Sequence, residues 1–364
     1  MTFMLPKEDE QNVAIKQHLV PRTYLKKWKH NTSKKTSKVW VYDKKEPGKN
    51  FKSTDVREVF FEEYFYDIKI GCNFMPEDAL QDLFGCLTEY EIMCNDKKLN
   101  SLKEYSDEFF DFDNWIIKDS NGVVATDEDK DKLKILLKNR RHTYIEKAWW
   151  QYENNWYRYV NKLEMKIQDI KNNALGISFS YEDIVEIFKY ITIYEMRNKN
   201  TNGFIDKIIK KMYGNLPAEI LECDIEQKDR THDFLDTIEK QYLHDSKIKG
   251  IYEYLKYDSG KYKAGLELYI DKMSVCFWTT TITNPFMTSG NPSMVIINEE
   301  GLYEHIFVIS PYLLVSLIKT DDVKCFYIKN CTVSDVERFN RKIVMNNDKI
   351  ISLSLVKNIS LLET

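Results

Sequence analysis

The chain has 364 residues, with 53 basic and 57 acidic side chains and a formal net charge of −4. Hydrophobic residues make up 43% of it, and 23 Tyr, 19 Phe and 7 Trp supply the bulk of a real core, which excludes a disordered chain. The near balance of charge excludes a strong overall field for nucleic acid but leaves room for a local basic groove.

Targeting and metal-binding signals are missing from the sequence. Its apolar runs are far shorter than the roughly 20 residues of a membrane span. Met1–Gln11 lacks the basic segment and the cleavage site of a signal peptide. The seven cysteines form no CxxC pair, which predicts reduced thiols and argues against structural zinc. We therefore expect a cytoplasmic protein that does not enter a membrane.

The N-terminal part, up to about Asp67, predicts irregular chain and strands. A short helix is expected at 22–28, after the extended approach that Pro21 favours. Val39–Tyr42 is a β-prone run that ends at turn signals. A second apolar stretch follows at 59–68.

Helices are expected to dominate the middle of the chain. Pro76-Glu77-Asp78 is typical of a helix N-terminus, and apolar residues at the helical period predict a helix over 79–94. A long helix is expected over 126–172, with a break near Glu153–Trp156. Ser180, with Asp183 three positions on, approximates a capping box for a helix that runs through Arg197.

The C-terminal part again predicts strands, at 275–283, 294–297 and 306–309, and then a helix at 333–346. The fold class that we expect is α+β, with a predominantly helical middle and with N-terminal and C-terminal strands that form one mixed or antiparallel sheet. Residues 1–364 are expected to be a single domain, in which the helical middle, roughly 76–260, is a candidate subdomain.

The sharpest candidate site is the N-terminal run that holds Gln17, His18, Arg22 and Tyr24. An imidazole, an amide, a guanidinium and a phenol crowd nine residues there. His18 could be a general acid or base, or a metal ligand, oriented by Gln17. The alternative is a structural histidine that bonds a backbone carbonyl and fixes the first loop.

Three further features have both a functional and a structural interpretation. Asp82 and Glu89 lie seven apart on the expected helix, so they share a face that could meet a metal or could simply be solvated. Arg197 could clamp a phosphate or favour the end of its own helix. Ser289 and Asn291 could present hydroxyl and backbone N–H groups to an anion, or form an ordinary Asn-Pro turn.

The motifs that contain these residues resemble those of a bacterial family catalogued as domain of unknown function 4238. The resemblance is ordered along nearly the whole chain. It is carried by Gln-His-x-x-Pro-x-x-Tyr-Leu at 17–25, Trp-x-Tyr-Asp-Lys at 40–44, the acidic helix with Asp82 and Glu89, the helix ending in Arg197, Thr-Ser-x-Asn-Pro at 288–292, Ile309-Ser310-Pro311 and the closing helix with Asn340-Arg341. One position departs from the pattern, because Gly290 stands where the family carries Asp.

The function that we expect is phosphodiester cleavage of RNA or DNA. His18, Gln17, Arg197 and the Ser289 turn would line one cleft, where arginine neutralises the phosphate and His18 transfers the proton. Glu89 would be the carboxylate of that site, and Mg²⁺ or Mn²⁺ is the candidate cofactor. Among the aromatic residues at 149–157, some could stack bases, although core packing is the commoner use.

The resemblance also implies a setting, since members of the family occur in mobile or defence-associated gene neighbourhoods. A nuclease effector of a phage-defence or toxin system is therefore the concrete form of the hypothesis. The alternative is a non-catalytic sensor or adaptor that binds a partner protein or a nucleic acid. No nucleotide-binding glycine loop, nucleophile elbow or HExxH motif is present, which argues against P-loop NTPases, classical hydrolases and zincins.

Overall fold

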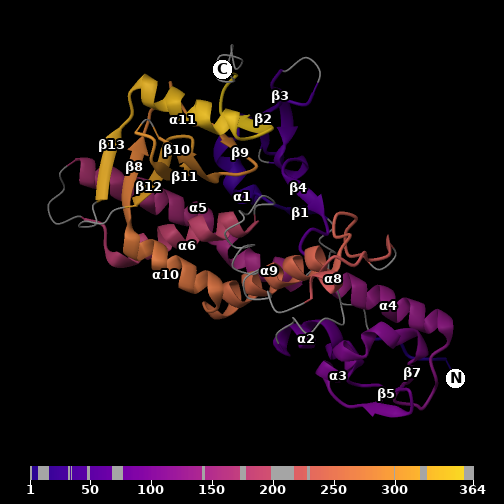
Figure 1. Cartoon of the computed structure of the whole chain (residues 1–364). Coiled ribbons are helices and arrows are strands. Elements are labelled where there is room, and N and C mark those ends of the chain that lie inside the picture. The colour runs from indigo at the N-terminus through magenta and orange to yellow at the C-terminus, as the bar shows by residue number, and fades with distance from the viewer. Residues whose placement is uncertain are drawn as a thin grey trace. The chain divides into compact units, whose positions relative to one another are not determined.

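The structure is a computed structural model of the chain (Figure 1). It describes residues 2–6, 16–31, 33, 35–46, 50–67, 77–141, 144–172, 178–197, 217–227, 230–298, 300–319 and 326–355. Two compact units are present, each assembled from separate stretches of the sequence. Unit 1 comprises Met1–Gln17, Glu63–Trp150 and Asn202–Lys261, and unit 2 comprises His18–Glu62, Gln151–Thr201 and Tyr262–Thr364.

Unit 2 contains a five-stranded mixed sheet in the order β10-β11-β12-β8-β13. Its strands are β8 (Met273–Thr279), β10 (Ser293–Ile297), β11 (Tyr303–Ser310), β12 (Leu313–Lys319) and β13 (Phe326–Asn330). Neighbours are antiparallel except β13, which runs parallel to β8. Most of β11 and β12 is buried, as their continuous apolar runs require.

A second sheet of unit 2 joins strands from both ends of the chain, all antiparallel, in the order β3-β2-β14-β9. Its members are β2 (Lys38–Asp43), β3 (Lys52–Asp55), β9 (Thr288–Ser289) and β14 (Lys349–Ser352). The α+β class is thus confirmed, but the strands that we expected in one sheet are divided between separate sheets. The two-residue strand β9 belongs to the second sheet, whereas its successor β10 lies in the first.

The helices of unit 2 are packed through aromatic side chains. They are α1 (Arg22–Leu25), η1 (Lys26–Trp28), η2 (Val56–Glu58), α5 (Tyr144–Lys171, which enters this unit at Gln151), α6 (Tyr181–Arg197), α10 (Lys261–Lys272, in this unit from Tyr262) and α11 (Val333–Met345). The rings of Trp156 on α5 and Tyr194 on α6 lie 5.9 and 5.1 Å from that of Phe307 on β11, and Figure 1 shows these helices alongside the sheet. The expected break at Glu153–Trp156 was wrong, because α5 is continuous there and Trp156 is buried.

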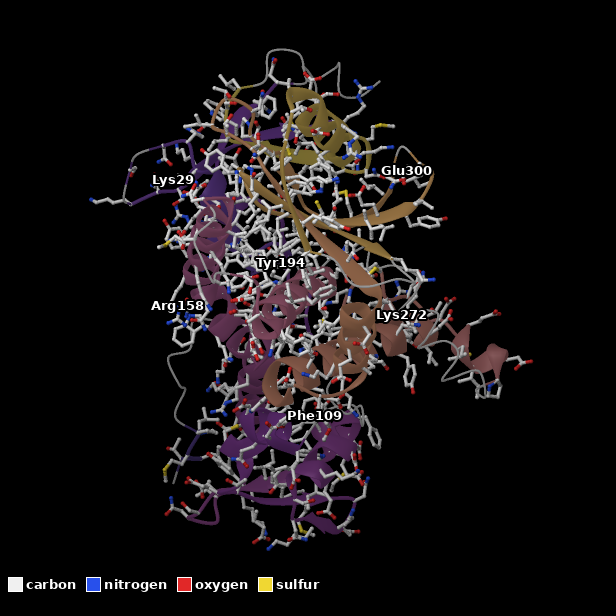
Figure 2. All side chains as sticks on the ribbon, turned by 90° about the vertical axis from the view of Figure 1, so that its left-hand side faces the viewer. Lys29, Phe109, Arg158, Tyr194, Lys272 and Glu300 are labelled. Carbon is white, nitrogen blue, oxygen red and sulfur yellow. The ribbon has the colours of Figure 1, made fainter. Side chains whose placement is uncertain are left out.

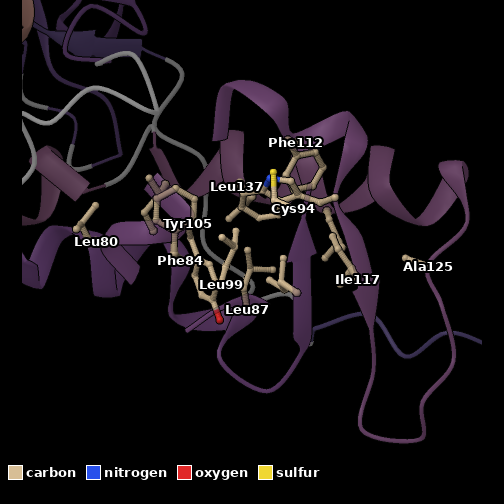
Figure 3. Packing of buried hydrophobic residues seen from close by; sticks show 14 of the residues in the cluster. Leu80, Phe84, Leu87, Cys94, Leu99, Tyr105, Phe112, Ile117, Ala125 and Leu137 are labelled. Atoms are coloured by element: carbon tan, nitrogen blue, oxygen red, sulfur yellow. The ribbon is translucent and has the colours of Figure 1, made fainter. Parts of the chain in front are cut away.

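Unit 1 is built around a separate hydrophobic cluster (Figure 3). Its elements are α2 (Glu77–Phe84), η3 (Gly85–Leu87), β5 (Glu91–Cys94), β6 (Lys97–Leu99), α3 (Leu102–Asp107), η4 (Phe109–Asn114), β7 (Ile116–Lys118), α4 (Asp127–Arg141), α8 (Ala218–Leu221), α9 (Ile238–Tyr257) and the part of α5 up to Trp150. Strands β6, β5 and β7 form a three-stranded sheet. The division between the units passes through β1 (Lys16–His18) and β4 (Phe61–Glu63), which pair with each other.

The prediction of one helix over 79–94 was wrong in its extent. Helix α2 ends at Phe84, and the chain continues through η3 into strand β5. Asn95 and Asp96 both have positive φ, as the two central residues of a tight hairpin turn require, and they join β5 to β6. Among the helices of the described residues, none combines the length and the apolar character needed to cross a membrane.

Candidate functional site

His18 ends strand β1 as a buried residue with one unused nitrogen. The side chain is 9% exposed, and its Nε2 atom is buried without a hydrogen-bond partner among the described residues. Burial, and then the charges of Arg22 and Arg197, lower the pKa of His18 from 6.5 to about 4. A hydrogen bond to the backbone of Arg57 and the charge of Glu153 oppose this shift of the pKa. The imidazole is therefore neutral at pH 7, and its Nε2 can accept a proton.

Arg197, the last residue of α6, holds the backbone of His18 in place. Its Nε and Nη2 atoms donate to the His18 carbonyl oxygen at 3.1 and 2.6 Å, and its Nη1 pairs with Glu153. The whole residue is buried. All three guanidinium nitrogens thus have protein partners, so the geometry fits a positioning role for this residue.

Arg22 and Tyr24 both lie on α1 but face different surroundings. Arg22 is exposed, and its charge is felt at His18, where it lowers the pKa. Tyr24 is fully buried, donates its hydroxyl to the Val308 carbonyl at 2.6 Å and lies 2.6 Å from the Thr288 hydroxyl. Burial raises the pKa of Tyr24 well above its usual value. Tyr24 therefore ties α1 to β9 and β11, and Arg22 is the one of the two that reaches solvent.

The turn at 289–291 is closed on itself, and its Gly290 lies close to the ring of Phe60. The Ser289 hydroxyl donates to the Asn291 carbonyl at 3.0 Å and accepts from the Asn291 N–H at 3.1 Å. A Cβ on Gly290 would lie 3.0 Å from the ring of Phe60, whose carbonyl accepts the N–H of Leu19 at 2.8 Å. Phe60 thus joins the turn to the chain next to His18. The Asn291 Oδ1 atom is buried without a partner among the described residues.

Gln17 and Glu89 belong to unit 1 and so lie outside the unit that holds the rest of the site. The buried Gln17 side chain accepts the backbone N–H of Tyr66. Glu89 is exposed in the turn between η3 and β5. The shared helix face expected for Asp82 and Glu89 is wrong, because α2 ends before Glu89.

Sequence reasoning missed Glu153, which pairs with Arg197, and also the separate polar contacts of His305. His305 on β11 is 3% exposed, with Nε2 3.1 Å from Glu195 Oε1 and 2.7 Å from Ser293 Oγ. Glu195 and Ser293 both contact the same nitrogen, whereas a Ser-His-acid relay uses both nitrogens of the ring. A single histidine in an apolar strand and a glutamate within a long helix carry no local signal that reveals such pairing.

Candidate metal ligands are not gathered in the described part of the chain. Within it, no group of three or more His, Cys, Asp or Glu side chains is placed to hold a metal ion. Of the aromatic residues considered for base stacking, Trp149 and Trp156 are buried in the core, whereas Trp150 and Tyr157 are 69% and 57% exposed.

The fold and the site define an α+β protein in which an arginine buried at a helix end fixes a histidine at a strand end. Comparison with known families then places it. The model of the family described as "Protein of unknown function (DUF4238)" matches residues 16–353, and the chain belongs to that family. Neither the curated proteins nor the solved structures contain a match to it. The matched range includes His18, Arg197 and the 288–292 turn, so the resemblance seen in the sequence is confirmed.

Proposed function

We propose that the chain cleaves phosphodiester bonds of RNA or DNA, with His18 as the general base. The observation that carries this proposal is the buried Nε2 atom of His18, which has no described hydrogen-bond partner. A general base must be unprotonated at the working pH and must have a free lone pair for the incoming proton. The lowered pKa of His18 supports the first condition, and the unused nitrogen supports the second.

The cation that binds the phosphate in this proposal is Arg22. Its guanidinium is exposed and near enough to lower the pKa of His18, whereas that of Arg197 is held by protein groups. A phosphate bound at Arg22 would neutralise one of the charges that lower the pKa of His18. The substrate itself would thus strengthen the base beside which it binds.

The reaction follows from these positions. The nucleophilic hydroxyl, of a water or of a ribose, gives its proton to His18 Nε2 while its oxygen attacks phosphorus. The bond from phosphorus to the leaving oxygen breaks, and that oxygen takes a proton from solvent. Arg22 offsets the charge that builds on the phosphoryl oxygens, and the imidazolium then returns its proton to water. Arg197 keeps the His18 backbone fixed throughout.

The direct test is cleavage of labelled tRNA, single-stranded RNA and plasmid DNA by the purified chain, with and without Mg²⁺ or Mn²⁺. His18→Ala and Arg22→Ala should abolish or strongly reduce cleavage, by the 10²–10⁴-fold typical of a general base for His18. Lys272→Ala, an exposed lysine of the same unit, is the control and should cleave normally. Circular dichroism of each variant checks folding. Cleavage that survives in His18→Ala would contradict the proposed base.

A second candidate is a non-catalytic sensor or adaptor, and a different observation favours it. Arg197, Tyr24 and Ser289 all have buried side chains with protein partners, which is what a structural latch requires. In that case no substrate would be cleaved under any metal condition, and His18→Ala would lower stability alone. For either function we propose a cytoplasmic setting, and the resemblance to the family motivates a role in phage defence or as a toxin.

A further inference from the structure

Positive charge is concentrated in one short segment of this acidic chain. The segment 22–38 contains seven basic residues and no acidic one: Arg22, Lys26, Lys27, Lys29, Lys34, Lys35 and Lys38. The remainder of the chain has 46 basic residues (53 less these seven) against 57 acidic ones. Such a block of one sign is typical of segments that bind polyanions.

Most of these charges are exposed and lack an acidic partner. Arg22, Lys26 and Lys35 are exposed and form no ion pair with a described residue. Lys38 is opposite Asp55 in the β2–β3 register, but the Asp55 carboxylate is held at 3.0 Å by Arg57. Lys34 lies outside the described residues. Uncompensated charge of one sign on a folded surface is available to bind an anion from solution.

Helix α5 extends this surface and adds an aromatic ring. Lys27 Nζ donates to Asn161 at 2.8 Å and lies 4.6 Å from the centre of the Tyr157 ring, which is 57% exposed. Arg158 follows Tyr157 and is also exposed. Glu164 is the acidic side chain beside Lys27, and it is already bonded to Lys27 and to the Ser310 hydroxyl.

Figure 2 shows Lys29 and Arg158 on the left of this view and Lys272 on the right. These two labelled cations therefore lie on the same side of this view, opposite Lys272. We call this surface the basic face; it comprises Arg22, Lys26, Lys27, Lys29, Lys35, Tyr157 and Arg158.

We propose that the basic face binds single-stranded nucleic acid, with its cations on successive phosphates and a base stacked on Tyr157. Binding of several phosphates requires exposed lysines and arginines in a row, and stacking requires an aromatic ring open to solvent. Only a base that is not paired within a duplex has a face free to stack on such a ring, which favours single strands over duplex. The assignment of this ligand as the substrate rests on the proposed function, because Arg22 belongs both to this face and to the His18 site.

Fluorescence anisotropy with labelled single-stranded RNA, single-stranded DNA and duplex DNA tests the proposal. The measurement uses the full-length chain with EDTA present, in parallel with the His18→Ala chain. The double variant Lys26→Glu/Lys35→Glu should bind single strands at least 10-fold more weakly. Its plot of log affinity against log salt should be shallower by about 1.4, which is roughly 0.7 for each of the two phosphates that the variant no longer neutralises. The matched control Lys272→Glu/Lys319→Glu makes the same charge change at two exposed lysines outside the basic face and should bind like wild type.

Tyr157 provides a separate test of stacking. Tyr157→Ala should weaken binding about 5- to 150-fold, since stacking on one aromatic ring contributes roughly 1–3 kcal/mol, whereas Tyr157→Phe should bind normally. Equally weakened binding in the two double lysine variants would overturn the proposal. So would tighter binding of duplex DNA, or binding to phosphatidylserine vesicles but to no nucleic acid. Binding as expected, with no cleavage in any metal condition, would refute the nuclease and leave the basic face as a nucleic-acid surface.

Discussion

Replacing Arg197 with methionine should destabilise unit 2 strongly, because the guanidinium is fully buried and bonded on three nitrogens. The variant leaves the His18 carbonyl without its two charged donors and leaves the Glu153 carboxylate, on a 20% exposed side chain, without its cation. Removing one partner of a buried ion pair lowers the free energy of unfolding by about 3–5 kcal/mol. The buried His18 carbonyl is destabilising for the same reason, because it too is left without its hydrogen-bond donors. We expect a decrease of about 4 kcal/mol in the free energy of unfolding.

Equilibrium urea unfolding, followed by tryptophan fluorescence and far-UV circular dichroism, measures this decrease. Arg341→Met removes an exposed arginine of the same unit and should change the unfolding free energy by less than about 0.5 kcal/mol. Adding Glu153→Gln to Arg197→Met should recover part of the stability, because the carboxylate is then no longer left unpaired. A change below about 1 kcal/mol in Arg197→Met would refute the positioning role.

Three further outcomes can be measured by the same unfolding assay. Burial lowers the pKa of His18 from 6.5 to about 4 in the folded chain, so the unfolded state takes up the proton first as the pH falls. The free energy of unfolding should therefore fall by up to about 3 kcal/mol between pH 6.5 and pH 4. His18→Gln should lose this part of the pH dependence, and an unchanged pH dependence in the variant would contradict the lowered pKa. Tyr24→Phe should cost about 1–2 kcal/mol by leaving the buried Val308 carbonyl without its donor, and no cost would show that the bond is absent. Gly290→Ala should lower the free energy of unfolding by about 1–3 kcal/mol, because the added Cβ would contact the Phe60 ring. This loss should be smaller in the Phe60→Ala background, and an equal loss there would show that the ring is not the obstacle.

Local signals in the sequence predicted local structure well. Ser180 and Asp183 form the expected cap, with Ser180 Oγ accepting the Asp183 N–H at 3.2 Å, and α6 runs to Arg197 as expected. The strands β2 and β8 and the helix α11 were found because their β-prone or periodic runs are continuous in the sequence. Such elements depend on neighbours within a few residues.

Partners that are distant in the sequence escaped prediction. An arginine at position 197 could bind either a phosphate or a backbone carbonyl, and the sequence does not distinguish the two. Only the fold brings the His18 carbonyl, 179 positions away, to its guanidinium. Helix α2 is also shorter than its apolar period suggests, because the period continues by chance into η3 and β5. Trp156 and Tyr157 are adjacent aromatic residues, and the sequence alone does not tell which is buried. The packing of α5 buries Trp156 and leaves Tyr157 exposed to solvent.

Only some of the residues that we expected to share one site lie in the same unit. His18, Arg197 and the 289–291 turn lie in unit 2 and are linked through hydrogen bonds and through Phe60, whereas Gln17 and Glu89 lie in unit 1. Gly290 accommodates the Phe60 ring at the position where the sequence departs from the family pattern.

The role of His18 as the base is tested by comparing wild type with His18→Gln in cleavage of single-stranded RNA, while binding of the same RNA is measured for both. His18→Gln keeps a polar side chain at this position but cannot accept the proton as imidazole does. We expect unchanged binding and a decrease in cleavage of at least roughly 10²-fold. Equal cleavage by the two proteins, or no cleavage by wild type with any metal ion, would contradict the assignment of His18 as the catalytic base.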